Sequence, residues 1–204
     1  MKFKNLEMTG FKSFSEKTTV LIEKGLTGIV GPNGCGKSNI VEALRWCMGE
    51  NSAKSMRGSG MEDVIFSGTS NLPSKNISEV KILLDNLEKN GPVQYKEFEE
   101  ISVKRKIEKD KGSKYYINDK EVRARDVQTL FADLSTGAHS PSLISQGRIG
   151  QLVTAKPVER KVILEEAAGI SGIHARRQEA ETRLNAAENN LKRADELKKQ
   201  QQKQ

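Results

Sequence analysis

The chain has 204 residues, of which 35% are hydrophobic and 5% aromatic, and it carries a net charge of +7 at pH 7 with two cysteines. No stretch approaches the roughly 20 apolar residues of a membrane helix, the first dozen residues lack the apolar core of a signal peptide, and two cysteines are too few for a disulfide framework. These features exclude membrane-spanning and disulfide-stabilised classes and favour a soluble cytoplasmic protein with no membrane partner, whose excess positive charge suits a polyanion.

Short strands dominate the first hundred residues. The predicted strands are Lys2–Met8, Thr18–Glu23, Leu26–Val30, Asp63–Ser67 and Ile77–Asp85. Each is β-branched or alternating and is bounded by turn residues. One helix is predicted to interrupt them, from Lys37 to Met48, because its apolar residues recur at helical spacing and Gly49 follows as a stop.

The segment between the Leu26–Val30 strand and this helix has the pattern G-x-x-x-x-G-K-[ST], which is typical of a phosphate-binding loop. Its glycines can aim backbone N–H donors at a phosphate without side-chain clash, Lys37 adds a positive charge, and Ser38 is a candidate Mg²⁺ ligand. The positive end of the following helix faces the same phosphates. The predicted nucleotide-binding residues are Gly31, Pro32, Asn33, Gly34, Cys35, Gly36, Lys37, Ser38 and Asn39.

A hairpin and a second helix are predicted next. Ile101–Ile107 and Lys114–Ile117 alternate as paired strands around a charged turn, and Arg123–Leu134 returns to helical spacing. The stretch from Ser102 to Arg125 holds nine basic and four acidic residues, a local net charge of +5. This segment is therefore the predicted contact for a polyanion.

The last third of the chain changes character. A Gly-, Ser- and Pro-rich loop is predicted over Gly137–Gly150, and a helix over Val158–Ala168 begins after Pro157. Apolar residues then recur in alternating steps of four and three, a heptad seam that predicts a coiled coil. The seam is Ala180, Leu184, Ala187, Leu191 and Ala194. We interpret it as the start of a longer coiled coil; the alternative is a solvated terminal helix lying on its own domain.

Four strings together resemble one family. They are G-F-K-S-F at Gly10–Phe14, S-M-R-G-S-G-M-E-D-V-I-F at Ser55–Phe66, L-I-S-Q-G at Leu143–Gly147 and E-R-K-V-I-L-E-E-A-A-G-I at Glu159–Ile170. In order and spacing they are similar to the N-terminal half-head of bacterial structural maintenance of chromosomes (SMC) proteins. The resemblance implies an α/β fold of the ABC-type ATPase half-head, a mixed sheet with flanking helices, followed by the start of a long coiled-coil helix. Residues 1–170 would form the lobe and 171–204 the ascending coil.

The resemblance also implies the site. Lys37, Arg57 and Gln146 become candidate catalytic residues, with ATP as the nucleotide and Mg²⁺ held by Ser38 and Gln146. Arg57 matches an arginine that reaches the γ-phosphate, and Gln146 a glutamine whose amide oxygen suits Mg²⁺. Arg123 and Arg125 match positions that contact DNA.

The implied function is chromosome condensation and segregation by ATP-driven engagement of two heads on DNA, in the nucleoid of the cytoplasm. The implied partners are sequence-independent double-stranded DNA, the protein's own C-terminal half-head, a second copy joined through hinge and heads, and kleisin-type accessory subunits. ATP hydrolysis would need the other half-head and the second head, so this chain alone is expected to be inactive.

Three alternatives stay open at this point: a repair ATPase of the RecN or RecF kind, a stand-alone P-loop or transporter ATPase, and a non-catalytic module whose coil recruits a partner. A stand-alone ATPase would need Asp85 as a second Mg²⁺ partner at the end of an apolar strand. However, Lys81 interrupts the apolar residues before Asp85, and the next residue is Asn86 instead of a catalytic glutamate. Leu134–Gly137 resembles the start of an ABC signature motif without its second glycine. We expect both true motifs to lie outside these residues.

Overall fold

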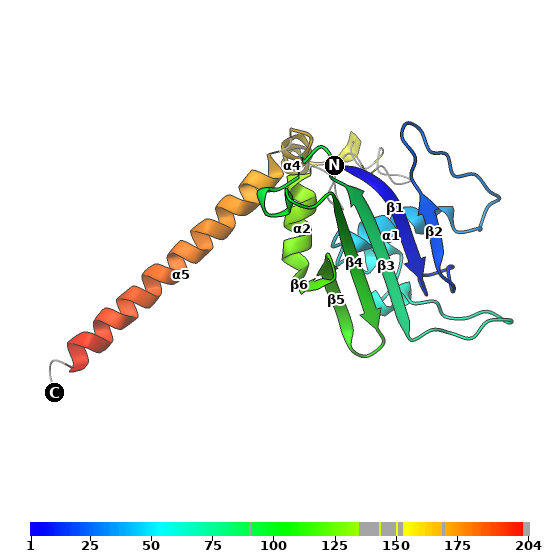
Figure 1. Cartoon of the computed structure of the whole chain (residues 1–204). Helices are drawn as coiled ribbons and strands as arrows, with labels where there is room; N and C mark the ends of the chain where they lie inside the picture. Colours follow the sequence, from blue (N-terminus) through cyan, green and yellow to red (C-terminus); the bar gives the residue numbers. More distant parts are fainter. Residues whose placement is uncertain (90, 135–142, 144–149, 151–152, 169, 202–204) are drawn as a thin grey trace.

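A six-stranded sheet forms the centre of the molecule (Figure 1), and the computed structural model describes residues 1–89, 91–134, 143, 150, 153–168 and 170–201. The strand order is β2-β1-β3-β4-β5-β6, and every neighbouring pair is antiparallel. The strands are β1 (Lys2–Thr9), β2 (Thr18–Leu21), β3 (Ile77–Asp85), β4 (Glu100–Glu108), β5 (Gly112–Ile117) and β6 (Lys120–Val122). The helices are α1 (Lys37–Cys47), α2 (Ala124–Asp133), α4 (Pro157–Ala167) and α5 (Ser171–Gln201), with 3₁₀ turns η1 (Lys54–Met56), η2 (Met61–Val64) and η3 (Val93–Tyr95).

The core lies between one face of the sheet and helix α1. Strands β3 and β4 alternate buried and half-exposed residues along their length, as strands with one covered face do. Helix α1 contacts both strands and contributes the fully buried Trp46, while α2 contacts β5 and buries Val127, Leu130 and Phe131. The phosphate loop therefore precedes a helix whose second half is buried against the sheet.

Most predicted elements are confirmed. The Ile77–Asp85 strand, the hairpin and the helices after the phosphate loop, after Arg123 and after Pro157 all form with ends shifted by two residues or fewer. Strand β6 was not predicted, because three residues between a turn and a helix carry too little alternation to be recognised. The expected sheet with flanking helices and a long terminal helix is present.

The predicted strand at Leu26–Val30 is wrong. The segment has no regular structure, and the side chains of Leu26 and Val30 are 99% and 94% exposed. A strand needs a neighbour that satisfies its backbone N–H and C=O groups. In the described part of the chain no strand pairs with this segment, so its apolar residues lie open to solvent.

The predicted strand at Asp63–Ser67 is also wrong, and here a side chain explains it. The carboxylate of Asp63 accepts backbone N–H groups from Ser59 at 2.6 Å and Gly60 at 2.9 Å, which closes the η2 turn. These bonds lower the pKa of Asp63. Within the described part of Asp63–Ser67, the one β-type pairing is an isolated bridge between Ile65 and Phe11.

Helix α5 is the long terminal helix that the heptad pattern predicted, and it extends away from the sheet (Figure 1). Its first turns lie against α2, where Arg176 forms an ion pair with Asp133 at 3.0 Å. All five seam residues are exposed, so the described chain does not cover the seam. Among the described residues, no helix combines the length and apolar character needed to cross a bilayer.

A buried cation ties the sheet to the end of α1. Arg105 of β4 is 2% exposed. Its guanidinium lies 4.5 Å from the ring centre of Trp46 and 4.7 Å from that of Tyr115. Its Nη1 donates to the carbonyl oxygens of Trp46 at 2.8 Å and Glu50 at 2.6 Å. Arg105 was one of the nine basic residues counted as a surface segment, and its burial removes it from any polyanion contact.

We predict that Arg105→Met lowers the free energy of unfolding by about 3 kcal/mol, because the methionine fills the space but takes the guanidinium donor from Glu50 O, leaves Trp46 O with the Gly49 N–H alone, and removes the stacking on two rings. Chemical denaturation followed by the fluorescence of Trp46, the chain's one tryptophan, measures the change. Lys104→Met, on the opposite face of the same strand, should cost less than about 1 kcal/mol. Equal effects of the two substitutions would contradict the role given to Arg105.

Candidate functional site

The phosphate loop turns into helix α1 through two glycines in left-handed conformation. Gly34 has φ 82° and Gly36, which caps α1, has φ 93°. A Cβ on Gly36 would lie 2.6 Å from Ser13 Oγ, so a larger residue would have to displace the Ser13 side chain and would also strain the left-handed backbone. The first turn of α1 contains no acidic residue and no side-chain cap. Its N–H groups are therefore suited to an anion.

The ammonium group of Lys37 lies within this loop. Its Nζ donates to the carbonyl oxygens of Gly31 and Pro32, both at 2.5 Å, and lies 3.7 Å from Cys35 Sγ. A positive charge and the N-terminus of a helix thus share one short segment, as the sequence predicted. The loop residues Asn33–Asn39, apart from Cys35, line a pocket of about 350 Å³.

The tight turn at Gly10–Phe14 contacts the junction between the loop and α1. The backbone N–H of Phe11 donates to Phe14 O at 2.9 Å, and that of Phe14 donates to Phe11 O at 2.8 Å. Ser13 Oγ accepts a hydrogen bond from Asn39 Nδ2 at 2.9 Å. The first of the four family-like strings therefore holds the junction between the loop and α1.

Arg57 lines the same pocket as the phosphate loop. It follows η1 with φ 55°, a left-handed conformation that is uncommon for a residue with a side chain. Its Nη2 donates to Asn39 Oδ1 at 3.0 Å, and its Nε forms an ion pair with Glu42 of α1. The structure thus brings Arg57, predicted from the resemblance alone, to the loop predicted from its glycines.

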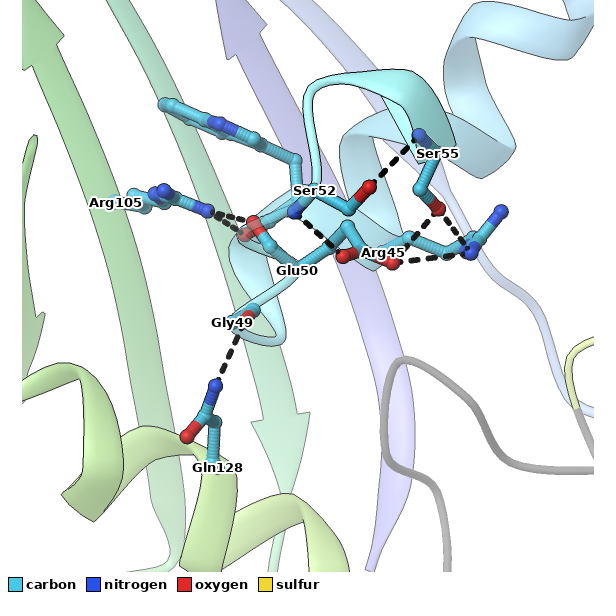
Figure 2. Close-up of polar contacts among 8 residues, drawn as sticks. Arg45, Gly49, Glu50, Ser52, Ser55, Arg105 and Gln128 are labelled. Carbon is cyan, nitrogen blue, oxygen red and sulfur yellow. Dashed lines mark hydrogen bonds and ion pairs between the residues drawn. The ribbon is translucent and has the colours of Figure 1, made fainter. Parts of the chain in front are cut away.

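A second polar cluster fixes the chain between α1 and Arg57 (Figure 2). The buried carboxylate of Glu50 accepts from Arg45 Nη2 at 3.1 Å, Ser55 Oγ at 2.8 Å and the backbone N–H of Ser52 at 2.8 Å. From α2, Gln128 Nε2 donates to Gly49 O at 2.9 Å. The segment that leads to Arg57 is therefore held at its base by α1, β4 and α2.

Three other residues considered for the site are Gln146, Arg123 and Arg125, and Asp85 is the alternative Mg²⁺ partner. Gln146 falls outside the described residues. Arg123 and Arg125 are exposed at the start of α2 and do not line the pocket. Asp85 ends β3, whereas Gly10 lies against Ile77 at the other end of that strand. At about 3.4 Å per residue this separation is roughly 27 Å, so Asp85 is not a second Mg²⁺ partner for this loop.

Sequence reasoning missed Glu42 and Lys12. The Glu42 side chain is only 10% exposed, and its carboxylate pairs with both Lys12 and Arg57. One signal was available, because Glu42 follows Asn39 by three residues and so shares its face of the helix. The pairing with Lys12, thirty residues away along the chain, leaves no local pattern.

Comparison with known proteins identifies the family and relatives of this arrangement. The model of the RecF/RecN/SMC N-terminal domain matches residues 2–148. The chain is 55% identical over 197 residues to the chromosome partition protein Smc of Cereibacter sphaeroides, which covers 97% of this chain and 17% of that protein. The chain thus spans about a sixth of the length of this relative.

Solved structures extend the likeness to the fold. A structure from work on ATP-driven dimerization and DNA-stimulated activation of SMC ATPases has a TM-score of 0.70 at 31% identity and covers 82% of this chain and 99% of that chain. The Smc head domain of Pyrococcus furiosus with an extended coiled coil, bound to the C-terminal domain of ScpA, has a TM-score of 0.76 at 31% identity and covers 96% and 49%. The expected fold class is confirmed.

We predict that Gly36→Ala lowers nucleotide affinity at least about tenfold, because the added Cβ displaces Ser13 and strains a left-handed backbone. Equilibrium titration with a fluorescent nucleotide measures the affinity. Gly60→Ala serves as the matched control, since a Cβ there has open space and φ is −133°. Unchanged affinity in Gly36→Ala would contradict the loop geometry described above.

Proposed function

The chain belongs to the RecF/RecN/SMC N-terminal domain family, and from this premise we propose that it is the N-terminal half of an ATP-binding head that organises DNA. Residues 1–170 form the lobe and residues 171–204 the start of the coiled-coil arm. The observation that carries the proposal is the single pocket lined by the phosphate loop and Arg57. The loop's glycine conformations, its free helix terminus and the position of Lys37 all fit a nucleoside triphosphate.

Each site residue has a defined task in this proposal. The loop's backbone N–H groups bind the β- and γ-phosphates, Lys37 neutralises their charge, and Arg57 binds the γ-phosphate. The exposed hydroxyl of Ser38 and the amide oxygen of Gln146 hold Mg²⁺, whose charge would polarise the γ-phosphate. Glycines and a helix terminus alone would suit any phosphate; the added arginine favours a triphosphate.

Half of the catalytic machinery lies outside this pocket. Among its described lining residues none is a carboxylate that could orient an attacking water, and Asp85 is at the far end of β3. The exposed Leu26–Val30 segment offers unpaired backbone and apolar side chains beside the loop. We propose that the C-terminal half-head covers this segment, that a second head completes the site, and that the chain alone does not hydrolyse ATP.

The partners follow from the same reasoning and from relatives. Arg123 and Arg125 are exposed and directly follow β6, which pairs with β5 of the lysine-bearing hairpin; this arrangement suits sequence-independent contacts to DNA phosphates. The P. furiosus Smc head is bound to ScpA, which supports a kleisin-type subunit as a partner here. The protein acts as a homodimer through hinge and heads in condensation and segregation of the chromosome, in the nucleoid of the cytoplasm.

A repair ATPase of the RecN or RecF kind is the second candidate, because the matching family model includes both groups. The 55% identity to a chromosome partition protein over 97% of the chain favours the first candidate. A stand-alone NTPase is disfavoured by the position of Asp85.

The two cysteines provide a test of ATP binding. Cys35 is exposed in the phosphate loop, whereas burial raises the pKa of the Cys47 thiol to about 12. In the full-length protein we expect Mg-ATP at about ten times its Kd to slow alkylation of Cys35 about tenfold, measured by mass spectrometry. Cys47 should stay unlabelled until the protein is denatured.

Lys37→Ala is the control variant for this experiment. It should abolish both the protection of Cys35 and ATP turnover, because the phosphate charge loses its partner. Protection that persists in Lys37→Ala, or its absence in the parent protein, would contradict nucleotide binding at the loop.

A charge test addresses DNA. We expect Arg123→Ala with Arg125→Ala to weaken binding of double-stranded DNA about equally for unrelated sequences and to reduce the slope of log K against log salt by about two. Fluorescence anisotropy at several salt concentrations measures both quantities. Lys17→Ala with Lys75→Ala, two lysines near the β2 edge, changes the net charge equally and should leave the slope unchanged; equal slopes for both pairs would contradict the assignment.

A further inference from the structure

One buried carboxylate pairs with Arg57 close to the phosphate loop. Glu42 is on α1, one turn beyond the loop, and its side chain is only 10% exposed. Its two oxygens are divided between two cations: Oε2 pairs with Lys12, and Oε1 pairs with Arg57 Nε. A carboxylate buried in this way is stable only because both cations compensate for its lost hydration.

The two cations are held very differently. The Lys12 side chain is 14% exposed, and its Nζ also donates at 2.5 Å to the carbonyl oxygen of Met56, the residue before Arg57. The Arg57 side chain is 59% exposed, and its other contact in the described structure is the bond to Asn39. Lys12 therefore fixes the backbone at Met56, whereas Glu42 and Asn39 fix the guanidinium.

These contacts leave Arg57 able to bind an anion. A guanidinium has five N–H donors, of which the Nε donor is directed to Glu42 and one Nη2 donor to Asn39. Arg57 itself lines the pocket of the phosphate loop, so the remaining donors are available to an anion that binds there. An exposed arginine on a flexible stem loses conformational entropy when it is ordered, and the Glu42 ion pair supplies that order before a ligand binds.

We propose that Glu42 is a positioning residue for Arg57: it sets the guanidinium at the phosphate loop and is itself oriented by its ion pair with Lys12. The proposal rests on the function proposed above. It predicts a particular kinetic signature. Loss of the Glu42 charge should lower turnover, because Arg57 is less well placed in the transition state. Nucleotide binding should change little, because the weaker contact of Arg57 with the γ-phosphate is offset by removal of a negative charge near the phosphates.

A double-mutant cycle in the full-length protein tests this inference. We expect Glu42→Gln to lower kcat about tenfold with KM for ATP little changed. In the Arg57→Ala background the same substitution should have no further effect on kcat, since there is no guanidinium left to place. Equal losses in both backgrounds, or a raised KM with unchanged kcat, would show that Glu42 only supports the fold and would overturn the proposal.

Two further variants keep the outcome decisive. Glu16→Gln removes a carboxylate from an exposed ion pair with Lys75 and should leave kcat and KM unchanged. If Glu42→Gln lowers the melting temperature enough to unfold the protein, Glu42→Asp replaces it in the cycle. This variant keeps the charge and shortens the side chain by one methylene. Its effect on kcat is compared in the parent and Arg57→Ala backgrounds in the same way. A parent protein that does not hydrolyse ATP, or hydrolyses it equally well as Lys37→Ala, overturns the proposed function itself, whereas additivity in a Lys37-dependent parent overturns the Glu42 inference alone.

Discussion

The contact on which this architecture depends is the buried guanidinium of Arg105. It is stacked on the rings of Trp46 and Tyr115 and bonded to two carbonyl oxygens, so one side chain joins the sheet, the end of α1 and the chain that leaves it. Burial lowers the pKa of this guanidinium, yet arginine stays protonated in proteins. Because its acceptors are backbone carbonyls, the contact fixes where the helix ends, whatever side chains the neighbouring loop carries. The Glu50 cluster holds Ser52 and Ser55 of the chain that leaves the helix, and Gln128 connects that chain to α2 (Figure 2).

The proposed nucleotide site has two kinds of support. The first kind comes from residues close together in the sequence: the glycines, helix terminus and lysine of the phosphate loop lie within eight residues. The turn at Gly10–Phe14 contacts this loop. The second kind comes from contacts between different elements. The Glu50 cluster fixes the start of the loop that carries Arg57, and Glu42 of α1 binds the Arg57 side chain. Local supports follow from backbone sterics, whereas the long-range ones depend on the packing of α1 against the sheet. A substitution in the core can therefore move Arg57 while leaving the phosphate loop in place.

Sequence patterns predicted what local physics decides. The phosphate loop, the Ile77–Asp85 strand and the long terminal helix could be read directly, because glycine conformations, alternation and heptads are properties of neighbouring residues. The strand predicted at Leu26–Val30 was wrong, because a β-type residue pattern does not show whether another strand is available to pair with it. Arg105 was misplaced because a charge count cannot distinguish an exposed cation from one stacked between rings. Glu42 was missed since its partner Lys12 is remote in sequence, and the resemblance supplied Arg57 where the residues alone could not.

The open segment at Leu26–Val30 also has a consequence in time. On the proposed arrangement its partner lies in the second half-head, close to the far end of the full-length protein; the Cereibacter sphaeroides relative is about six times longer than this chain. At roughly 5–20 residues per second of synthesis, the segment would wait on the order of one to three minutes before it is covered. Glycines at 25 and 28 and the charged pair Glu23 and Lys24 weaken its tendency to join other strands during that interval. The composition of this stretch suits a surface that must remain both apolar and unpaired while the rest of the protein is made.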